Sequence, residues 1–220
     1  MTIKASSLLS LIAIWGAMVP AIALQGEAWW SLIFAFLASG AVGISAMRRL
    51  GLSRLAAISG IWGGAAAAIA SDPDNAWMAV FAFLATGATV YSPLRRDAYL
   101  NGLGIAAAWA SSGAMAARDN DAAWTSVFAF LAAGVLAGSR GNPLKGVVAM
   151  LAWGGVAAIA IPNRDYYWLS VLAFAACIVA FSGGGFSFPR GLEWDLFDRK
   201  GGIDSDDDRP SRTVNFRVRR

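Results

Sequence analysis

The chain has 220 residues, of which 57% are hydrophobic and only 15% are charged, and it contains one cysteine and no histidine. Ordinary soluble domains have about 25% charged residues, so this composition is typical of a membrane protein. A single cysteine excludes an intrachain disulfide, and the lack of histidine removes the usual axial ligand of haem or chlorophyll-type pigments and the commonest metal ligand.

The apolar residues form eight blocks nearly free of charge, each long enough to cross a bilayer core of about 30 Å at about 1.5 Å per residue. Consecutive blocks pair across a short turn and predict four helical hairpins, at residues 5–49, 52–96, 98–140 and 144–183. We therefore predict an all-α membrane protein with eight transmembrane helices, built as four tandem helical-hairpin repeats with a period of about 47 residues. Such repeats share one orientation and stand around or along an axis normal to the membrane.

The first block also has features of a secretory signal peptide, since it begins near Lys4 and contains Ala-x-Ala at 21–23. Cleavage there would leave the second helix of the first hairpin unpaired. The spacing from Trp15 to Trp30 equals the spacing in the other hairpins. A retained transmembrane helix is therefore the favoured interpretation.

Two tryptophans mark each hairpin. The first lies near the middle of the first helix, at Trp15, Trp62, Trp109 and Trp153. The second follows fifteen residues later, at Trp30, Trp77, Trp124 and Trp168. An indole N–H near mid-membrane requires an acceptor or a polar ligand, whereas an indole at a helix start suits the membrane interface. We expect these rings to pack against the small residues that follow the first tryptophan, or to line a groove for an apolar or aromatic cofactor.

The second helices carry small residues four positions apart, namely Ala35 and Ser39, Ala82 and Thr86, Ala129 and Ala133, and Ala173 and Cys177. Helices in lipid associate through close backbone approach, so this stripe predicts a helix contact face.

An acid stands three residues before each second tryptophan, at Glu27, Asp74, Asp121 and Asp165. A carboxylate at a helix N-cap accepts from free backbone N–H groups and suits the positive end of the helix, so we predict that these acids cap the second helices. The alternative is a ring of carboxylates that attracts cations at one membrane face.

The loops between hairpins are basic, and the turns within hairpins are mainly acidic. The loop residues are Arg48, Arg49, Arg54, Arg95, Arg96, Arg140 and Lys145. An excess of lysine and arginine marks the cytoplasmic side, so we place both termini in the cytoplasm, with a bacterial inner membrane as the expected location. The net charge of +4 follows from this topology and does not predict nucleic-acid binding.

The composition changes after the eight-helix domain, which we place at 1–185. Residues 186–220 form a predicted cytoplasmic tail that is partly disordered, in which 186–200 mixes aromatic and charged residues and is expected to lie along the membrane surface. The expected lipid or partner contacts of the tail are Phe186, Trp194, Phe197, Phe216, Arg217, Arg219 and Arg220. The alternating end of the tail suits either anionic headgroups or strand addition to a partner sheet.

Catalytic chemistry has no candidate residues in this sequence. Acids and bases occur only at the ends of the apolar blocks, which argues against proton relays and ion-coupled transport, and no nucleotide-binding motif is present. We therefore predict no enzymatic activity, no catalytic residue and no metal ligand.

Two functions remain. The first is a non-catalytic accessory or scaffold subunit of a larger membrane complex, in contact with lipids and other membrane subunits, with lipid, quinone or carotenoid held by apolar contact alone. The second is a pore or facilitator for a small neutral solute through a pseudo-fourfold bundle. The lining would need Ser59, Asn101, Ser111 and Ser112. The pore hypothesis predicts that Ser59 and Ser111 face a common axis, and the scaffold hypothesis predicts that they face helix contacts.

Overall fold

The fold is described from a computed structural model at residues 5–45, 51–92, 99–139 and 143–182. Every regular element in these ranges is helical. The elements are α1 (Ala5–Leu24), η1 (Gly26–Ser31), α2 (Leu32–Ser45), α3 (Leu52–Ser71), η2 (Pro73–Trp77), α4 (Met78–Tyr91), α5 (Tyr99–Arg118), η3 (Asn120–Trp124), α6 (Thr125–Gly138), α7 (Pro143–Ala160), η4 (Arg164–Tyr166) and α8 (Leu169–Ser182). A long α-helix, a short 3₁₀ helix and a second α-helix thus follow one another four times.

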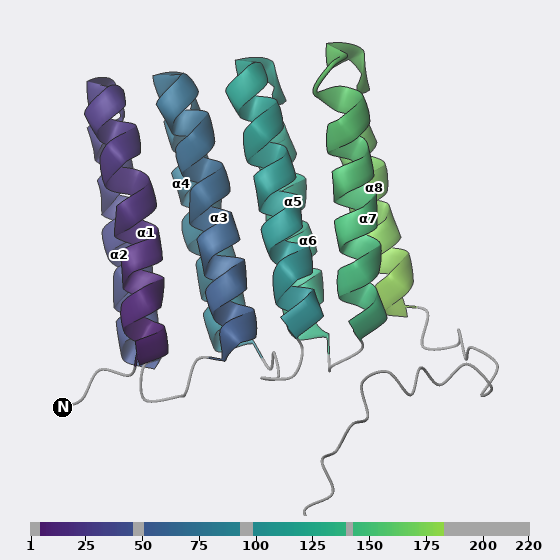
Figure 1. Ribbon diagram of the computed structural model, residues 1–220, viewed down its shortest axis with the longest axis horizontal. Coiled ribbons are helices and arrows are strands. Elements are labelled where there is room, and N and C mark those ends of the chain that lie inside the picture. Colours follow the sequence, from purple (N-terminus) through teal and green to yellow (C-terminus); the bar gives the residue numbers. More distant parts are fainter. Residues whose placement is uncertain (1–4, 46–50, 93–98, 140–142, 183–220) are drawn as a thin grey trace, which may run out of the picture. The chain divides into compact units, whose positions relative to one another are not determined.

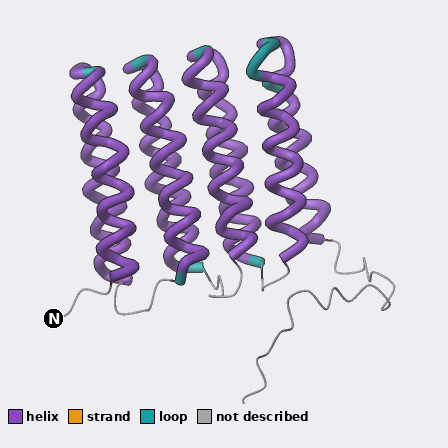
Figure 2. Tube along the Cα trace, viewed as in Figure 1, coloured by secondary structure: helices purple, strands orange, loops and turns teal. Residues whose placement is uncertain are grey.

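The helices form two layers. The odd-numbered helices pack in chain order, α1 on α3, α3 on α5 and α5 on α7, and the even-numbered helices do the same from α2 to α8. Each odd helix also packs on the even helix that follows it, which makes four helix pairs. The pairs stand side by side in a row whose ends are α1/α2 and α7/α8 (Figures 1 and 2). The repeats were predicted to stand either around an axis, as a closed ring, or along it, as an open row. The described helices form the open row.

Glycines allow the odd layer to pack through its backbone. A Cβ on Gly64 of α3 would overlap the carbonyl of Trp109 on α5, and a Cβ on Gly113 would overlap the backbone of Gly64. The same holds between α5 and α7, where a Cβ on Gly146 would overlap the carbonyl of Leu100. Lipid tails are as apolar as the helix surfaces, so the hydrophobic effect does not drive helices together in a membrane. Close backbone approach, with the van der Waals packing that it allows, is a main source of helix association there.

Four helical segments of the described chain are long and apolar enough to cross a membrane, at Ala5–Leu24, Gly26–Ile44, Leu52–Ser71 and Asn120–Gly138. Leu144–Ala160 is apolar but shorter. The α4 and α8 helices have 14 residues each, and at about 1.5 Å per residue each covers only about 21 Å. The four long apolar segments support an integral membrane protein, whereas the predicted eight spans stay a prediction.

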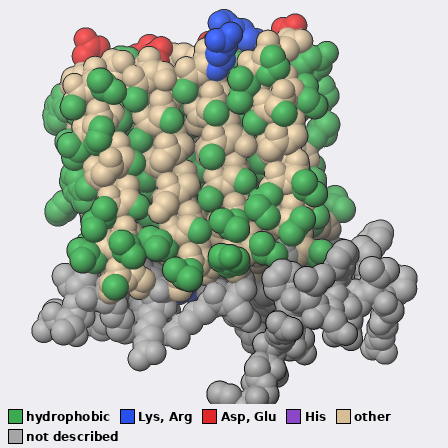
Figure 3. Space-filling view, viewed as in Figure 1, with side chains coloured by type: hydrophobic (Ala, Val, Ile, Leu, Met, Phe, Trp, Pro, Cys, Tyr) green, Lys and Arg blue, Asp and Glu red, His purple; other side chains and the backbone are tan. Residues whose placement is uncertain are grey.

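The distribution of side chains agrees with a membrane setting. Hydrophobic side chains cover the length of the visible face, and charged side chains gather at the end that carries the 3₁₀ turns (Figure 3). Charges at span ends and apolar side chains between them are the arrangement that a bilayer requires.

Candidate functional site

In the helix pairs α1/α2 and α3/α4, the mid-helix tryptophan donates a hydrogen bond to the second helix of its pair. The indole nitrogen of Trp15 lies 2.9 Å from Ser39 Oγ, and that of Trp62 lies 2.9 Å from Thr86 Oγ1. Each hydroxyl in turn donates to the carbonyl four residues earlier in its own helix, at Ala35 and Ala82, over 2.8 Å. An indole N–H in the interior of a helix pair is thereby satisfied by a hydroxyl that is itself satisfied.

The third and fourth pairs lack this hydroxyl. The residue 24 positions after the first tryptophan is Ala133 in the third pair and Cys177 in the fourth. Among the described residues, the buried indole nitrogens of Trp109 and Trp153 have no hydrogen-bond partner, although the weakly accepting Cys177 thiol lies beside Trp153. The indole N–H of Trp109 is therefore a buried unpaired donor, which costs about 1–3 kcal/mol, and that of Trp153 has only the weak thiol acceptor beside it.

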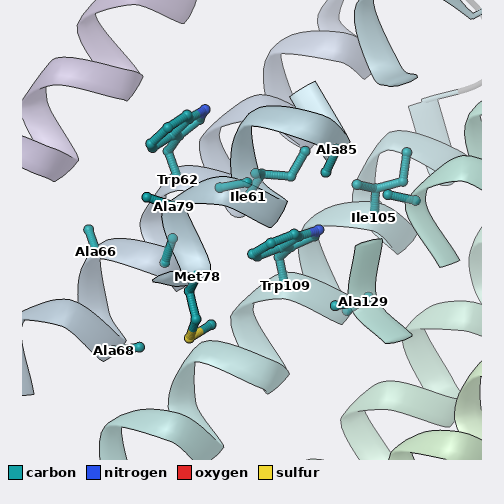
Figure 4. Packing of buried hydrophobic residues seen from close by; sticks show 14 of the residues in the cluster. Ile61, Trp62, Ala66, Ala68, Met78, Ala79, Ala85, Ile105, Trp109 and Ala129 are labelled. Atoms are coloured by element: carbon teal, nitrogen blue, oxygen red, sulfur yellow. The ribbon is translucent and has the colours of Figure 1, made fainter. Parts of the chain in front are cut away.

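The mid-helix tryptophans are core residues in this arrangement. Trp62, Trp109 and Trp153 are fully buried, and Trp15 is half-buried against the same core. Trp62 and Trp109 lie with their indole nitrogens directed the same way, among alanines that include Ala79 and Ala129 (Figure 4). Side chains without exposed surface cannot line an open groove, so the predicted apolar-ligand groove is not formed at these three fully buried rings.

The second tryptophans begin an aromatic ladder across the even layer. Three of them, Trp30, Trp77 and Trp124, contact the phenylalanine four residues later in edge-to-face geometry at 5.5–6.1 Å between centroids. That phenylalanine then contacts a phenylalanine of the next even helix, in the pairs Phe34–Phe83, Phe81–Phe130 and Phe128–Phe174 at 5.9–6.3 Å. In the last pair Leu172 replaces the phenylalanine, and Trp168 is 51% exposed. The ladder thus links all four pairs.

The small-residue stripe is buried along the contact faces of the even helices. The alanines Ala35, Ala82, Ala129 and Ala173 have at most 2% of their surface exposed. The role of Ser39 and Thr86 as hydrogen-bond acceptors was not predicted, although each stands 24 residues after a tryptophan, a spacing that the sequence shows.

The helix caps lie two residues before the predicted ones. The cap oxygens belong to Asp72, Asp119 and Asn163, which accept from the backbone N–H of Asp74, Asp121 and Asp165 at 2.9–3.3 Å. In the first pair the cap position is Gln25, whose side chain makes no cap bond, and Glu27 lies in the first turn. The predicted capping role of the four acids is therefore wrong. They lie in the first 3₁₀ turn because a 3₁₀ helix, not the α-helix, begins here, and they still suit its positive end.

Side chains at this end also join neighbouring pairs. The Gln25 amide donates to the Ala70 carbonyl at 3.1 Å, and the Asn75 amide donates to the Ala116 carbonyl at 3.4 Å. At the third junction the guanidinium of Arg164 lies 3.2 Å from the carboxylate of Asp119. One polar contact thus closes each of the three junctions.

Tyr167 lies in the turn between α7 and α8 beside this last ion pair. Burial, followed by the nearby carboxylate of Asp119, raises the pKa of the Tyr167 phenol above its ordinary value of 10.0. The phenol therefore stays neutral throughout the physiological range.

The opposite end is closed by polar residues of the odd helices. Arg54 lies in α3 and not in a free loop as predicted, because its guanidinium donates to the carbonyls of Thr89 and Ser92 at the end of α4, at 3.3 and 2.8 Å. A cation at a helix C-terminus offsets the unpaired carbonyls and the negative end of the helix. Asn101 of α5 acts similarly, donating to Ser139 Oγ at 2.7 Å and accepting from the Gly146 N–H at 3.1 Å.

The polar residues proposed for a pore do not face a common space. Asn101 and Ser112 are fully buried in helix contacts, and Ser112 exchanges a hydrogen bond with Thr125 of α6 at 2.8 Å. Ser111 is also buried, whereas Ser59 is exposed on α3. The structure therefore brings Ser112 and Asn101 to helix contacts and leaves Ser59 apart from them.

The predicted tail contacts, from Phe186 to Arg220, and the other loop arginines lie outside the described residues. Within the described ranges, no group of three or more histidine, cysteine, aspartate or glutamate side chains is placed to hold a metal ion. No protein-family model, curated protein or solved structure matches this chain.

Proposed function

We propose that the chain is a non-catalytic accessory or scaffold subunit of a larger membrane protein complex. It spans the membrane eight times, as four tandem helical-hairpin repeats, with both termini in the cytoplasm of a bacterial cell. Its partners are membrane lipids and other membrane protein subunits, and neither nucleic acid nor an enzymatic substrate is among them.

The observation that carries this proposal is the use of polar side chains for helix contacts. Ser112 and Thr125 bond to each other, Asn101 joins α5 to Ser139 and α7, and Ser39 accepts from Trp15. Polar groups inside a span are expensive unless satisfied, and proteins that transport or react leave some of them free to meet a solute. In the three contacts named here the polar groups hold one helix to another.

The eight spans receive support from the 3₁₀ helices. The 14 residues of α4 are too few alone, but η2 precedes them without interruption. At about 2.0 Å per 3₁₀ residue and 1.5 Å per α residue, η2 and α4 together reach about 31 Å, the thickness of a bilayer core. The tandem repeat is supported by the recurrence of the tryptophan–hydroxyl bond at 24 residues in the first two pairs.

The exposed faces provide the surface for partners. Large apolar side chains such as Phe36, Leu151 and Val179 are exposed along the helices. In a bilayer these faces meet lipid or other subunits, and a quinone or carotenoid fits the same faces by apolar contact. The tail from Phe186 to Arg220 supplies the predicted cytoplasmic contact.

The pore is the weaker alternative. It requires a closed bundle with polar groups on its axis, whereas the described helices stand in an open row and bury Asn101 and Ser112 in contacts. We expect no solute flux through the isolated chain.

Native mass spectrometry of the protein purified from its own membrane in mild detergent tests the proposal. We expect a stoichiometric set of other subunits, and we expect truncation after Gly185 to release them. The matched control is the full chain with the cysteine replaced, Cys177→Ala, which retains the tail. A chain that leaves the membrane alone, or only with copies of itself, overturns the accessory role, and liposome flux through the Ser111 region becomes the next measurement.

A further inference from the structure

The aromatic ladder of the even layer repeats one contact three times. In each case a phenylalanine of one helix pair meets the phenylalanine two positions further along in the next pair, as in Phe34–Phe83 and Phe81–Phe130. The direction is constant, from an earlier pair to a later one. A helix pair can therefore make this contact on both of its sides. The residue four positions after its second tryptophan faces the next pair, and the residue six positions after it faces the preceding pair.

At each end of the described row, one of these two positions faces no neighbouring pair. Phe36 of α2 stands at the position of Phe83 and Phe130, but its pair is the first of the described row, and it is 68% exposed. At the other end Leu172 of α8 stands at the position of Phe34 and Phe81, and it is 53% exposed. By contrast Phe83 and Phe130 pack against the core.

The odd layer ends in the same way. Gly155 has the same offset from Trp153 as Gly64 has from Trp62, yet a Cβ on Gly155 would meet nothing within 4 Å, whereas one on Gly64 would overlap α5. The helix face around Gly155 continues with exposed Leu151, and the facing side of α1 continues with exposed Ile12. In both layers, therefore, the positions that contact a neighbouring pair within the row are left exposed at its two ends.

The α1 face carries larger residues than α5, with Leu8 and Val19 at the offsets of Gly102 and Gly113. The contact between α1 and α3 already lacks these glycines, since Leu55 and Ala66 stand at the same two offsets of α3. The row therefore also packs where these glycines are absent, and the open backbone at Gly155 leaves space for a side chain such as Val19.

We propose that the α7/α8 end of one copy binds the α1/α2 end of a second copy, head to tail, with Leu172 against Phe36 and Gly155 against Val19. The occupant is a second copy of this chain because the two end faces are the two halves of a contact that the chain already forms three times. An association of unlike faces continues as a filament unless the rotation between copies closes it into a ring. This self-association rests on the proposed function for its membrane setting and names one of its partners.

Disulfide trapping in native membranes tests the pairing of ends. In a Cys177→Ala background, one copy carries Phe36→Cys, another carries Leu172→Cys, and each has its own tag. Oxidation is expected to link the two tags, with Phe34→Cys/Phe83→Cys in a single chain as the reference for the same contact. Phe36→Cys with Leu84→Cys is the matched control, because Leu84 is also exposed but lies in the middle of the row.

A second measurement does not depend on cysteine chemistry. Phe36→Ala is expected to raise the dissociation constant of the self-complex in detergent by about two- to tenfold, because the Phe36 ring loses its packing against Leu172, and Leu84→Ala is expected to leave it unchanged. A mixed pair that does not cross-link, or Phe36→Cys copies that link to each other equally well, overturns head-to-tail pairing.

The two proposals fail separately. If foreign subunits are found by native mass spectrometry while the ends do not cross-link, only the self-association is wrong. If the ends cross-link and the protein carries no foreign subunit, the accessory role is wrong and the self-association stands.

Discussion

Contacts between helix pairs and contacts within them obey different rules in this protein. Between α3 and α5 the backbones touch at Gly64 and Gly113, and a Cβ at either position would overlap main-chain atoms. Within a pair, the residue facing the mid-helix tryptophan is serine, threonine, alanine or cysteine at Ser39, Thr86, Ala133 and Cys177.

The difference shows where this architecture tolerates change. A contact made by backbone atoms cannot adjust, because moving it means moving a whole helix. A contact between side chains can exchange a hydroxyl for a methyl group at the cost of one hydrogen bond. We therefore expect substitutions between pairs to have larger effects than substitutions within them.

The largest effect is expected for Gly64→Leu. The new side chain would overlap the Trp109 carbonyl, so α3 and α5 would have to separate, at a cost of about 3 kcal/mol or more. Gly63→Leu is the matched control, because the neighbouring Gly63 has open space where its Cβ would lie. Unfolding in mixed detergent micelles measures both, and equal effects of the two substitutions would show that the backbone contact is not the cause.

Phe81→Ala is expected to rank second. Phe81 contacts both Trp77 and Phe130, and each aromatic pair contributes about 0.5–1.5 kcal/mol, so the loss is expected to be about 1–3 kcal/mol. Leu84→Ala on the exposed side of the same helix serves as the control. A larger loss from Leu84→Ala in the same unfolding assay would contradict a stabilising role of the ladder.

Within a pair, Thr86→Val is expected to cost about 1 kcal/mol. Valine has nearly the same shape as threonine, but the buried indole N–H of Trp62 loses its acceptor. Thr86→Ser keeps the hydroxyl and is expected to retain most of the stability. The measurement is the free energy of unfolding, followed through tryptophan fluorescence, and the idea fails if valine and serine behave alike.

The smallest effect is a gain. Ala133→Ser places a hydroxyl where Ser39 stands in the first pair, so that the unpaired indole of Trp109 acquires an acceptor. We expect the stability to rise by about 0.5–1 kcal/mol. In a Trp109→Phe background the same substitution should give no gain, and a gain there would show that the serine acts in another way.

Much of the local structure could be predicted from the sequence. The helices, the short turns between them and the burial of Ala35, Ala82 and Ala129 follow from apolar blocks and small residues at helical spacing. The cap at Asp72 was missed because the turn begins with a 3₁₀ helix, which moves the first free N–H groups toward the preceding residues. The acceptor role of Thr86 was missed because a small-residue stripe and a hydroxyl acceptor have the same spacing.

The sequence alone determined that the chain is helical and apolar enough for a membrane, since helix formation and span length depend on residues close together in the chain. Only the tertiary structure decided that the described pairs form an open row. That choice depends on the angle at which one pair meets the next, set by many small contacts such as Gly64 against Trp109 and Phe81 against Phe130. A local pattern can indicate which faces are small, but not which neighbour will occupy them.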